Sequence, residues 1–319
     1  MATIRSGLSH RGVTAMQSYF HRHALACVIV LYAALAPVIA LGAGRDEIVR
    51  EDIASYGDYR FVMEQRVVHY DDEQTEYLKI EKMEAFLIVY KGGQEVYRSE
   101  EGYIFHLYDR GFLPEVGTDV TGDGTPDIVI VNASDGNNPD VVTYIFELRE
   151  PLNLIVIYGG VIFQDLDNTG GLELKVLEPG FNYWKTSGSS SAHPHVILRY
   201  RDSRYVFATD LTRKPPLSIS EFDRIVSELH DNRWHPDFLP YVLLQTTVGL
   251  IYTGNVMQAL EFIEAAWPPS LSGKDDFMAE LFQCQLRHSI WWPDIAQMNN
   301  LPADKVFDDC FVRQYDSFR

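Results

Sequence analysis

The hydrophobic pattern of the chain changes twice, and these changes divide the sequence into three parts. A continuous apolar run from Ala24 to Leu41 comes first. Short alternations of apolar and polar residues then continue to about residue 212, and a period of two predicts β-strands. After residue 216 the apolar positions recur about every 3.6 residues, which predicts α-helices. The pattern therefore predicts a leader, a β region over 46–212 and a helical region over 217–319.

The β region contains several short segments rich in β-branched and aromatic residues. A pattern typical of strands begins at Tyr59 and continues to Tyr108. A hairpin turn is predicted within it at Gly92-Gly93, because paired glycines supply the positive φ of a tight turn. Turn-forming clusters separate the later segments. The further strands are predicted over residues 128–132, 141–148, 154–163, 172–177, 196–200 and 205–208.

The helical region begins after Lys214-Pro215-Pro216, where a domain boundary is predicted. Ser218 and Glu221 have the spacing of a capping box, in which a hydroxyl and a carboxylate bond to free amides at a helix start. Helices are predicted over 219–230, 238–253, 255–266, 274–288 and 291–299. The expected fold class is α+β, with an antiparallel β region (an incomplete propeller-like meander or a sandwich) followed by a C-terminal α-helical domain.

The first 44 residues have the composition of a secretory signal. They contain no Asp or Glu, and three basic residues precede the apolar run: Arg5, Arg11 and Arg22. Pro37 and the small residues at the end of the run favour cleavage, so a signal peptide is predicted over 1–42. A retained membrane anchor is the alternative, because about 18 apolar residues lie at the lower limit for crossing a bilayer. Cleavage would give a periplasmic or secreted protein without stable membrane insertion.

Composition and charge narrow the classes of partner. The chain has 319 residues, 46% of them hydrophobic, which is typical of a folded protein. Asp and Glu number 45 against 27 Lys and Arg, a net charge of −18. Phosphate backbones and anionic lipids repel such a surface, so no nucleic-acid partner is expected. Cys284 and Cys310 follow the leader, and whether they form a disulfide stays open.

Residues 119–127 have the pattern of a calcium-binding loop. Calcium takes six to eight oxygen ligands, and a tight loop supplies them from alternate residues while a glycine turns the chain. Positions 1, 5 and 9 of this loop carry carboxylates, position 3 carries a hydroxyl, position 6 is Gly124, and position 7 offers a backbone carbonyl. The predicted ligands are Asp119, Thr121, Asp123, Thr125 and Asp127.

Residues 165–173 form a second copy of the pattern, 46 positions later. Acids occupy positions 1, 3 and 9 of this copy, and Gly170 occupies position 6, but position 5 is a threonine instead of an acid. Its predicted ligands are Asp165, Asp167, Thr169 and Glu173. We expect this loop to bind calcium more weakly than the first, or not at all. Position 12 of the first loop is the apolar Ile130, so neither copy is an EF-hand.

A loop of this kind that runs directly into an apolar strand resembles the calcium-loop repeats of integrin-type propellers, the FG-GAP or VCBS class. The motifs that carry the resemblance read Asp-Val-Thr-Gly-Asp-Gly-Thr-Pro-Asp-Ile and Asp-Leu-Asp-Asn-Thr-Gly-Gly-Leu-Glu-Leu, within residues 113–178. With its leader and helical tail, the whole chain is similar to exported bacterial VCBS-repeat proteins of uncharacterised activity. A complete propeller has at least four blades, so two loops imply an incomplete one.

The motifs predict an exported calcium-binding protein that acts as a binding or structural module, with calcium stabilising the β region. A protein or a glycan is the expected partner, and no catalytic residue is predicted. The alternative function is a periplasmic hydrolase with calcium near its substrate loop. A cleft that brings acidic residues together with Tyr183 and Trp184 would favour the hydrolase.

Overall fold

A computed structural model describes residues 47–70, 80–100, 102, 104–106, 113–133, 141–230, 234–235 and 238–303. The chain from Glu47 onward forms one compact unit. The predicted signal peptide and Cys310 lie outside the described residues.

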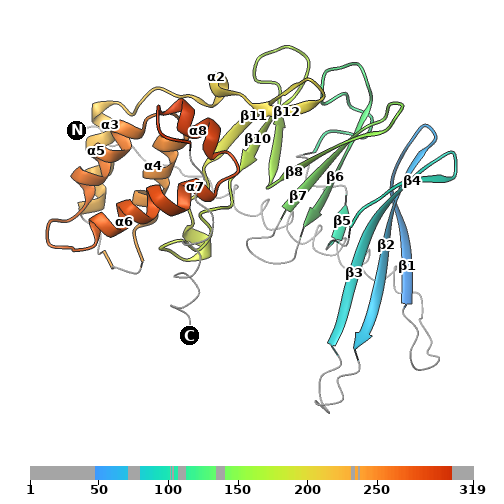
Figure 1. Ribbon diagram of the computed structural model, residues 1–319, viewed down its shortest axis with the longest axis horizontal. Coiled ribbons are helices and arrows are strands. Elements are labelled where there is room, and N and C mark those ends of the chain that lie inside the picture. Colours follow the sequence, from blue (N-terminus) through green and yellow to red (C-terminus); the bar gives the residue numbers. More distant parts are fainter. Residues whose placement is uncertain are drawn as a thin grey trace, which may run out of the picture. The chain divides into compact units, whose positions relative to one another are not determined.

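The described strands form three antiparallel sheets of four strands each (Figure 1). Sheet A contains β1 (Glu47–Tyr56), β2 (Tyr59–Tyr70), β3 (Ile80–Lys91) and β4 (Gln94–Arg98). Sheet B contains β5 (Ile104–His106), β6 (Asp127–Ala133), β7 (Val141–Glu147) and β8 (Asn153–Tyr158). Sheet C contains β9 (Val161–Gln164), β10 (Glu173–Leu177), β11 (His195–Arg201) and β12 (Arg204–Phe207).

Within each sheet the strands lie side by side in the order of the sequence, so each sheet is a simple meander. Propeller blades have the same four-stranded layout. Among the described strands the three meanders stay open and form no closed barrel. The predicted class, an antiparallel β region followed by helices, is confirmed.

The predicted hairpin at Gly92-Gly93 joins β3 to β4. Lys91 pairs with Gln94 across the turn, and the two glycines have φ angles of 55° and 86°. These left-handed angles are costly for any residue with a Cβ, which is why a glycine pair is found here.

Two features of the strands differ from the sequence prediction. The pattern did not predict β1, because its side chains are mostly exposed and adjacent apolar residues such as Ile48 and Val49 both face solvent. The single strand predicted over 154–163 is wrong, since β8 ends at Tyr158 and β9 begins at Val161. Gly159, with a φ of 110°, turns the chain there from sheet B into sheet C.

Strand β6 is the central strand of the β region. Its side chains are buried on both faces: Ile128 and Ile130 pack with residues of sheet A such as Phe61, whereas Val129 packs with residues of sheet C such as Leu174. Burial on two faces explains why this strand reads as a continuous apolar run rather than as an alternation.

The helices follow sheet C and share its hydrophobic core. Leu198 of β11 belongs to the same buried cluster as Leu244 and Val248 of α4. The helical elements are the 3-10 turn Gly188–Ser190, α2 (Thr209–Thr212), α3 (Ile219–His230), α4 (Tyr241–Tyr252), α5 (Val256–Ala266), α6 (Lys274–Glu280), a π-helical segment (Leu281–Gln285), α7 (Leu286–His288) and α8 (Trp292–Met298). Within the described ranges, no helix has both the length and the apolar character required to cross a bilayer.

The capping box at the start of α3 is confirmed. The Ser218 hydroxyl accepts the Glu221 amide at 3.3 Å, and the Glu221 carboxylate accepts the Ser218 amide at 3.1 Å. Cys284, in the π-helical segment, is disulfide-bonded, and the two other cysteines of the chain lie outside the described residues.

Candidate metal centre

The two predicted calcium loops occupy equivalent places in neighbouring sheets. Loop 1 (119–127) precedes the second strand of sheet B, and loop 2 (165–173) connects the first and second strands of sheet C. The last acid of each loop is also the first residue of the strand that follows: Asp127 begins β6 and Glu173 begins β10. The offset of the two motifs in the sequence therefore corresponds to a structural repeat.

The hydrogen bonds inside the loops repeat as well. The first acid accepts the amide three residues later, Gly122 to Asp119 at 2.7 Å and Asn168 to Asp165 at 2.6 Å. In both loops the last acid accepts the amide of the second residue, at 2.8 Å. Matching bonds at both ends of the loop indicate that the two copies fold in the same way.

The two loops contact each other directly. The Leu172 amide of loop 2 donates to the Val120 carbonyl of loop 1 at 2.8 Å. Gly122 lies so close to Gly171 that a Cβ on Gly122 would be 2.6 Å from the Gly171 Cα. The hydroxyl of buried Tyr205 lies 3.2 Å from both the Val120 and the Leu172 carbonyl oxygens. Loops from two sheets therefore form one packed unit.

In loop 1 the Asp119 carboxylate binds the turn from within. Besides the Gly122 amide, it accepts the amides of Asp123 at 3.2 Å and Gly124 at 2.8 Å. The Thr121 hydroxyl lies 3.4 Å from Asp119 and 3.2 Å from Asp127. Three of the predicted ligands, at positions 1, 3 and 9, thus face one another across the loop.

Asp127 carries the buried charge of loop 1. Its side chain is 1% exposed, and its Oδ2 accepts the amides of Val120 and Thr121. Its Oδ1 is buried and has no hydrogen-bond partner among the described residues. The pKa of Asp127 is raised to about 7, chiefly by burial and to a lesser extent by the Asp119 carboxylate, although the hydrogen bonds from Thr121 and Val120 lower it. A buried carboxylate oxygen without a partner costs free energy, and a cation would satisfy it.

Asp123 is oriented differently from the other acids of loop 1. Its Oδ1 accepts the Thr125 amide at 2.8 Å, and its Oδ2 lies 3.9 Å from the Arg149 guanidinium. Burial tends to raise the pKa of Asp123, but the bonds from Thr125 and the charge of Arg149 outweigh burial and lower it. Thr125 contacts Asp123 through its amide and its side chain, whereas its carbonyl was the predicted ligand.

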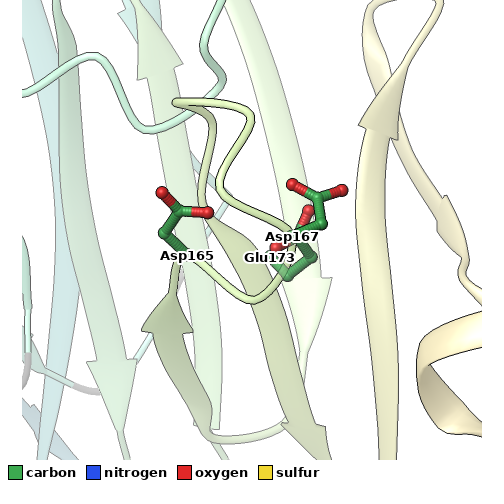
Figure 2. Close-up of side chains that lie close together, drawn as sticks. All are labelled: Asp165, Asp167 and Glu173. Carbon is green, nitrogen blue, oxygen red and sulfur yellow. The ribbon is translucent and has the colours of Figure 1, made fainter.

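Loop 2 brings three carboxylates together. Atoms of Asp165, Asp167 and Glu173 lie within 4.8 Å of one another, and no other group of three His, Cys, Asp or Glu does so among the described residues. Figure 2 shows Asp167 and Glu173 side by side, with Asp165 opposite them on the loop. The Thr169 hydroxyl, a predicted ligand, donates to Asp167 at 2.6 Å.

A guanidinium from β11 reaches into loop 2. The Nε of Arg199 lies 2.9 Å from Asp167 Oδ2 and 3.5 Å from Glu173 Oε1, and its Nη2 lies 3.0 Å from Asp210. The Thr169 bond and the Arg199 charge lower the pKa of Asp167, against a smaller effect of burial. An internal cation therefore already offsets part of the charge of loop 2.

The sequence pattern did not identify the residues that join the loops to the rest of the fold. Arg199 and Tyr205 come from strands that follow both motifs, and their side chains reach back to them. Glu147, at the end of β7, is fully buried, and it accepts bonds from Tyr200 and Asn153. Each is a polar residue within or at the end of a strand, and no local sequence motif distinguishes it from other polar residues.

The chain matches no protein-family model, no curated protein and no solved structure. The resemblance to FG-GAP or VCBS loops remains a prediction from the two motifs.

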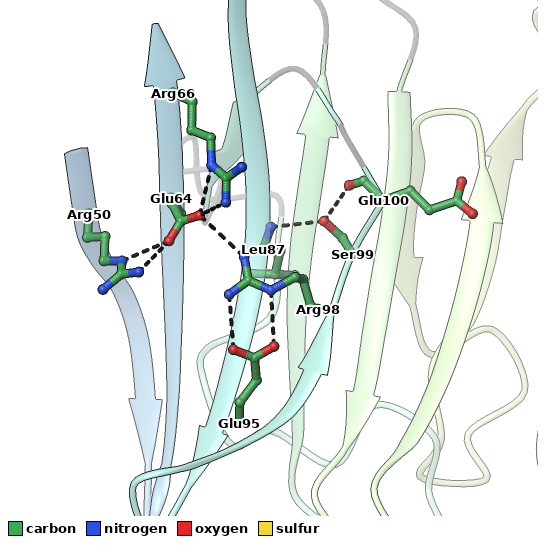
Figure 3. A network of polar contacts seen from close by, with 8 residues as sticks. All are labelled: Arg50, Glu64, Arg66, Leu87, Glu95, Arg98, Ser99 and Glu100. Carbon is green, nitrogen blue, oxygen red and sulfur yellow. Dashed lines mark hydrogen bonds and ion pairs between the residues drawn. The ribbon is translucent and has the colours of Figure 1, made fainter. Parts of the chain in front are cut away.

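A second polar cluster, on sheet A, surrounds the carboxylate of Glu64 (Figure 3). The Glu64 side chain is 1% exposed and accepts bonds from Arg50 and Arg66, both at 2.8 Å, and from Arg98 at 3.3 Å. Arg98 also donates to Glu95. Burial raises the pKa of Glu64, but the bonds from Arg66 and Arg50 outweigh burial, and the pKa lies below its ordinary value of 4.5. The network stabilises sheet A.

Gly122→Ala should destabilise the protein more than Gly124→Ala. Both glycines have positive φ, 72° and 89°, so each substitution costs about 1–2 kcal/mol of backbone strain. Only the Cβ at position 122 would collide with backbone, that of Gly171, which adds about 1–3 kcal/mol. Chemical denaturation measures both free energies of unfolding. Equal losses for the two variants would show that the loops do not pack as described.

Glu64→Gln should lower the free energy of unfolding by about 1–3 kcal/mol at neutral pH, because it removes charge-assisted hydrogen bonds from a buried site. Since the folded pKa of Glu64 is depressed, its contribution is present above pH 4.5 and is lost as the pH falls through the folded pKa. The difference between Glu64→Gln and the native protein should therefore shrink in acid. Glu51→Gln, at an exposed position of β1, is the control and should show no such dependence on pH. A difference that is constant with pH would contradict this assignment.

Proposed function

We propose that the chain is an exported calcium-binding protein in which calcium stabilises the β region, so that the region acts as a binding or structural module. The observation that carries the proposal is the cluster of Asp165, Asp167 and Glu173, with carboxylate atoms within 4.8 Å of one another. A protein or a glycan is the proposed partner. Export to the periplasm or the exterior rests on the predicted leader.

The donor set favours calcium over a transition metal. Every candidate ligand in the two loops is an oxygen, and a hard cation such as calcium prefers oxygen ligands. Three carboxylates do not complete a shell of six to eight, and backbone carbonyls or waters would supply the remainder. Loop 2 can therefore hold calcium if Arg199 shares the carboxylates Asp167 and Glu173.

Loop 1 supports the proposal through a separate observation. In the part of the chain that the structure describes, the buried Oδ1 of Asp127 has no hydrogen-bond partner, although Oδ2 of the same carboxylate has three. A cation beside it would satisfy the oxygen and favour the ionised form of the carboxyl group. The same cation would lie near Asp119 and Thr121, which already face Asp127.

The role proposed for calcium is structural. The final acids of both loops begin buried strands, and the loops themselves join sheets B and C. A cation in each loop would hold that loop against the start of its strand and reduce the repulsion among its carboxylates. A ligand that binds only the folded state adds about 2.7 kcal/mol of stability at a hundredfold excess over its Kd.

The side chains named for a hydrolase do not share a cleft. Trp184 is 2% exposed, stacks on Phe277 in the core and donates its indole N–H to Glu280 at 2.7 Å. Tyr183, in contrast, is 64% exposed. The hydrolase alternative therefore gains no support from these two residues.

Calorimetric titration of the calcium-depleted protein should show calcium uptake, and saturating calcium should raise the unfolding temperature. Asp127→Asn and Glu173→Gln preserve side-chain volume, and each should weaken uptake in its own loop, because each removes one charged ligand. Glu261→Gln, on the exposed face of α5, should leave uptake unchanged.

A native protein that takes up no calcium, and whose unfolding temperature is the same in calcium and in chelator, is not a calcium-binding protein. Equal uptake by the native protein and by both loop variants would place the ion elsewhere.

A further inference from the structure

A cavity on sheet C lies next to loop 2. Its volume is about 400 Å³, which is sufficient for a small organic molecule. Residues of β11, β12 and the α2 region line it: Arg199, Arg201, Val206, Phe207, Ala208, Thr209, Asp210 and Arg213. We refer to it as the arginine pocket.

The charge of the arginine pocket is opposite to that of the chain. Three of its eight lining residues are arginines and one is acidic, whereas the protein as a whole carries a net charge of −18. In the Glu64 network three arginines surround a buried carboxylate. In the arginine pocket the only carboxylate is Asp210, whose side chain is 65% exposed.

The three guanidinium groups differ in how they are held. Arg199 is fixed by ion pairs to Asp167 and Asp210, and Arg213 donates to the Met298 carbonyl at 2.6 Å. The Arg201 side chain is exposed and makes no hydrogen bond or ion pair within the part of the chain that the structure describes. After the bond from Arg199, its charge also helps to lower the pKa of Asp210. Arg201 is therefore the lining arginine whose fork is open to a ligand, whereas Arg199 is shared with three carboxylates.

We propose that the arginine pocket binds a small organic anion through its carboxylate or phosphate group. The planar fork of an arginine matches both oxyanions, with two parallel hydrogen bonds. Arg201 supplies the uncommitted fork, and Arg199 and Arg213 add positive charge. Val206, Phe207 and Ala208 provide an apolar wall for the carbon skeleton of the ligand.

This inference goes beyond the calcium proposal and does not depend on it. The lining residues belong to β11, β12 and the segment up to Arg213, and none belongs to either calcium loop. Binding is therefore tested on protein in buffer depleted of divalent cations, so failure of one proposal leaves the other intact.

The test is a calorimetric titration with two probes, inorganic phosphate and benzoate, at constant ionic strength. The variant is Arg201→Gln, and the matched control is Arg204→Gln. The two positions pair across the β11–β12 hairpin and both side chains are exposed, but only Arg201 lines the pocket. Neither substitution removes a side-chain hydrogen bond or ion pair within the described part of the chain, so both variants should fold.

We expect the native protein to bind at least one probe. Arg201→Gln should weaken binding about tenfold or more, because it removes a charge-assisted pair of bonds, and Arg204→Gln should have a much smaller effect. Binding of one probe alone supports the pocket and identifies the oxyanion. No uptake of either probe overturns the proposal, and so do equal losses in the two variants, which would indicate general attraction to a basic surface.

Discussion

The hydrogen bond from the Leu172 amide to the Val120 carbonyl is the constraint on which the rest of the site depends. It joins two loops that precede strands of different sheets, and the close approach of Gly122 to Gly171 leaves no room for a side chain between them. The Tyr205 hydroxyl lies within hydrogen-bond distance of both the Val120 and the Leu172 carbonyl oxygens and so contacts both loops. The acids of the two loops are therefore concentrated at one place in the fold, which is electrostatically costly without a compensating cation.

The protein compensates this charge unequally in the two loops. In loop 2 the Arg199 guanidinium pairs with Asp167 and Glu173, whereas in loop 1 burial raises the pKa of Asp127 to about 7. Arg199 also lines the arginine pocket. The same side chain therefore contacts the acids of loop 2 and lines the neighbouring pocket.

Local signals in the sequence were sufficient for most of the fold. The helix over 219–230 and its capping box depend on contacts a few residues apart, and both are confirmed. The break between β8 and β9 at Gly159 was not predicted, because apolar residues continue on both sides of it. The turn is evident only from the φ of 110° at Gly159. For the site, the loop positions could be predicted from spacing. The contact between the loops could not, since it depends on how sheets B and C pack, and Arg199 and Tyr205 reach the loops only through that packing.

Amide hydrogen exchange in the Asp127→Ala variant tests whether the two loops form one unit. This substitution removes the acceptor of the Val120 and Thr121 amides in loop 1 and touches no residue of loop 2. We expect faster exchange both in 119–127 and at Leu172 in loop 2, with β2 and β3 of sheet A unchanged. Faster exchange confined to 119–127, with Leu172 as protected as in the native protein, would contradict it.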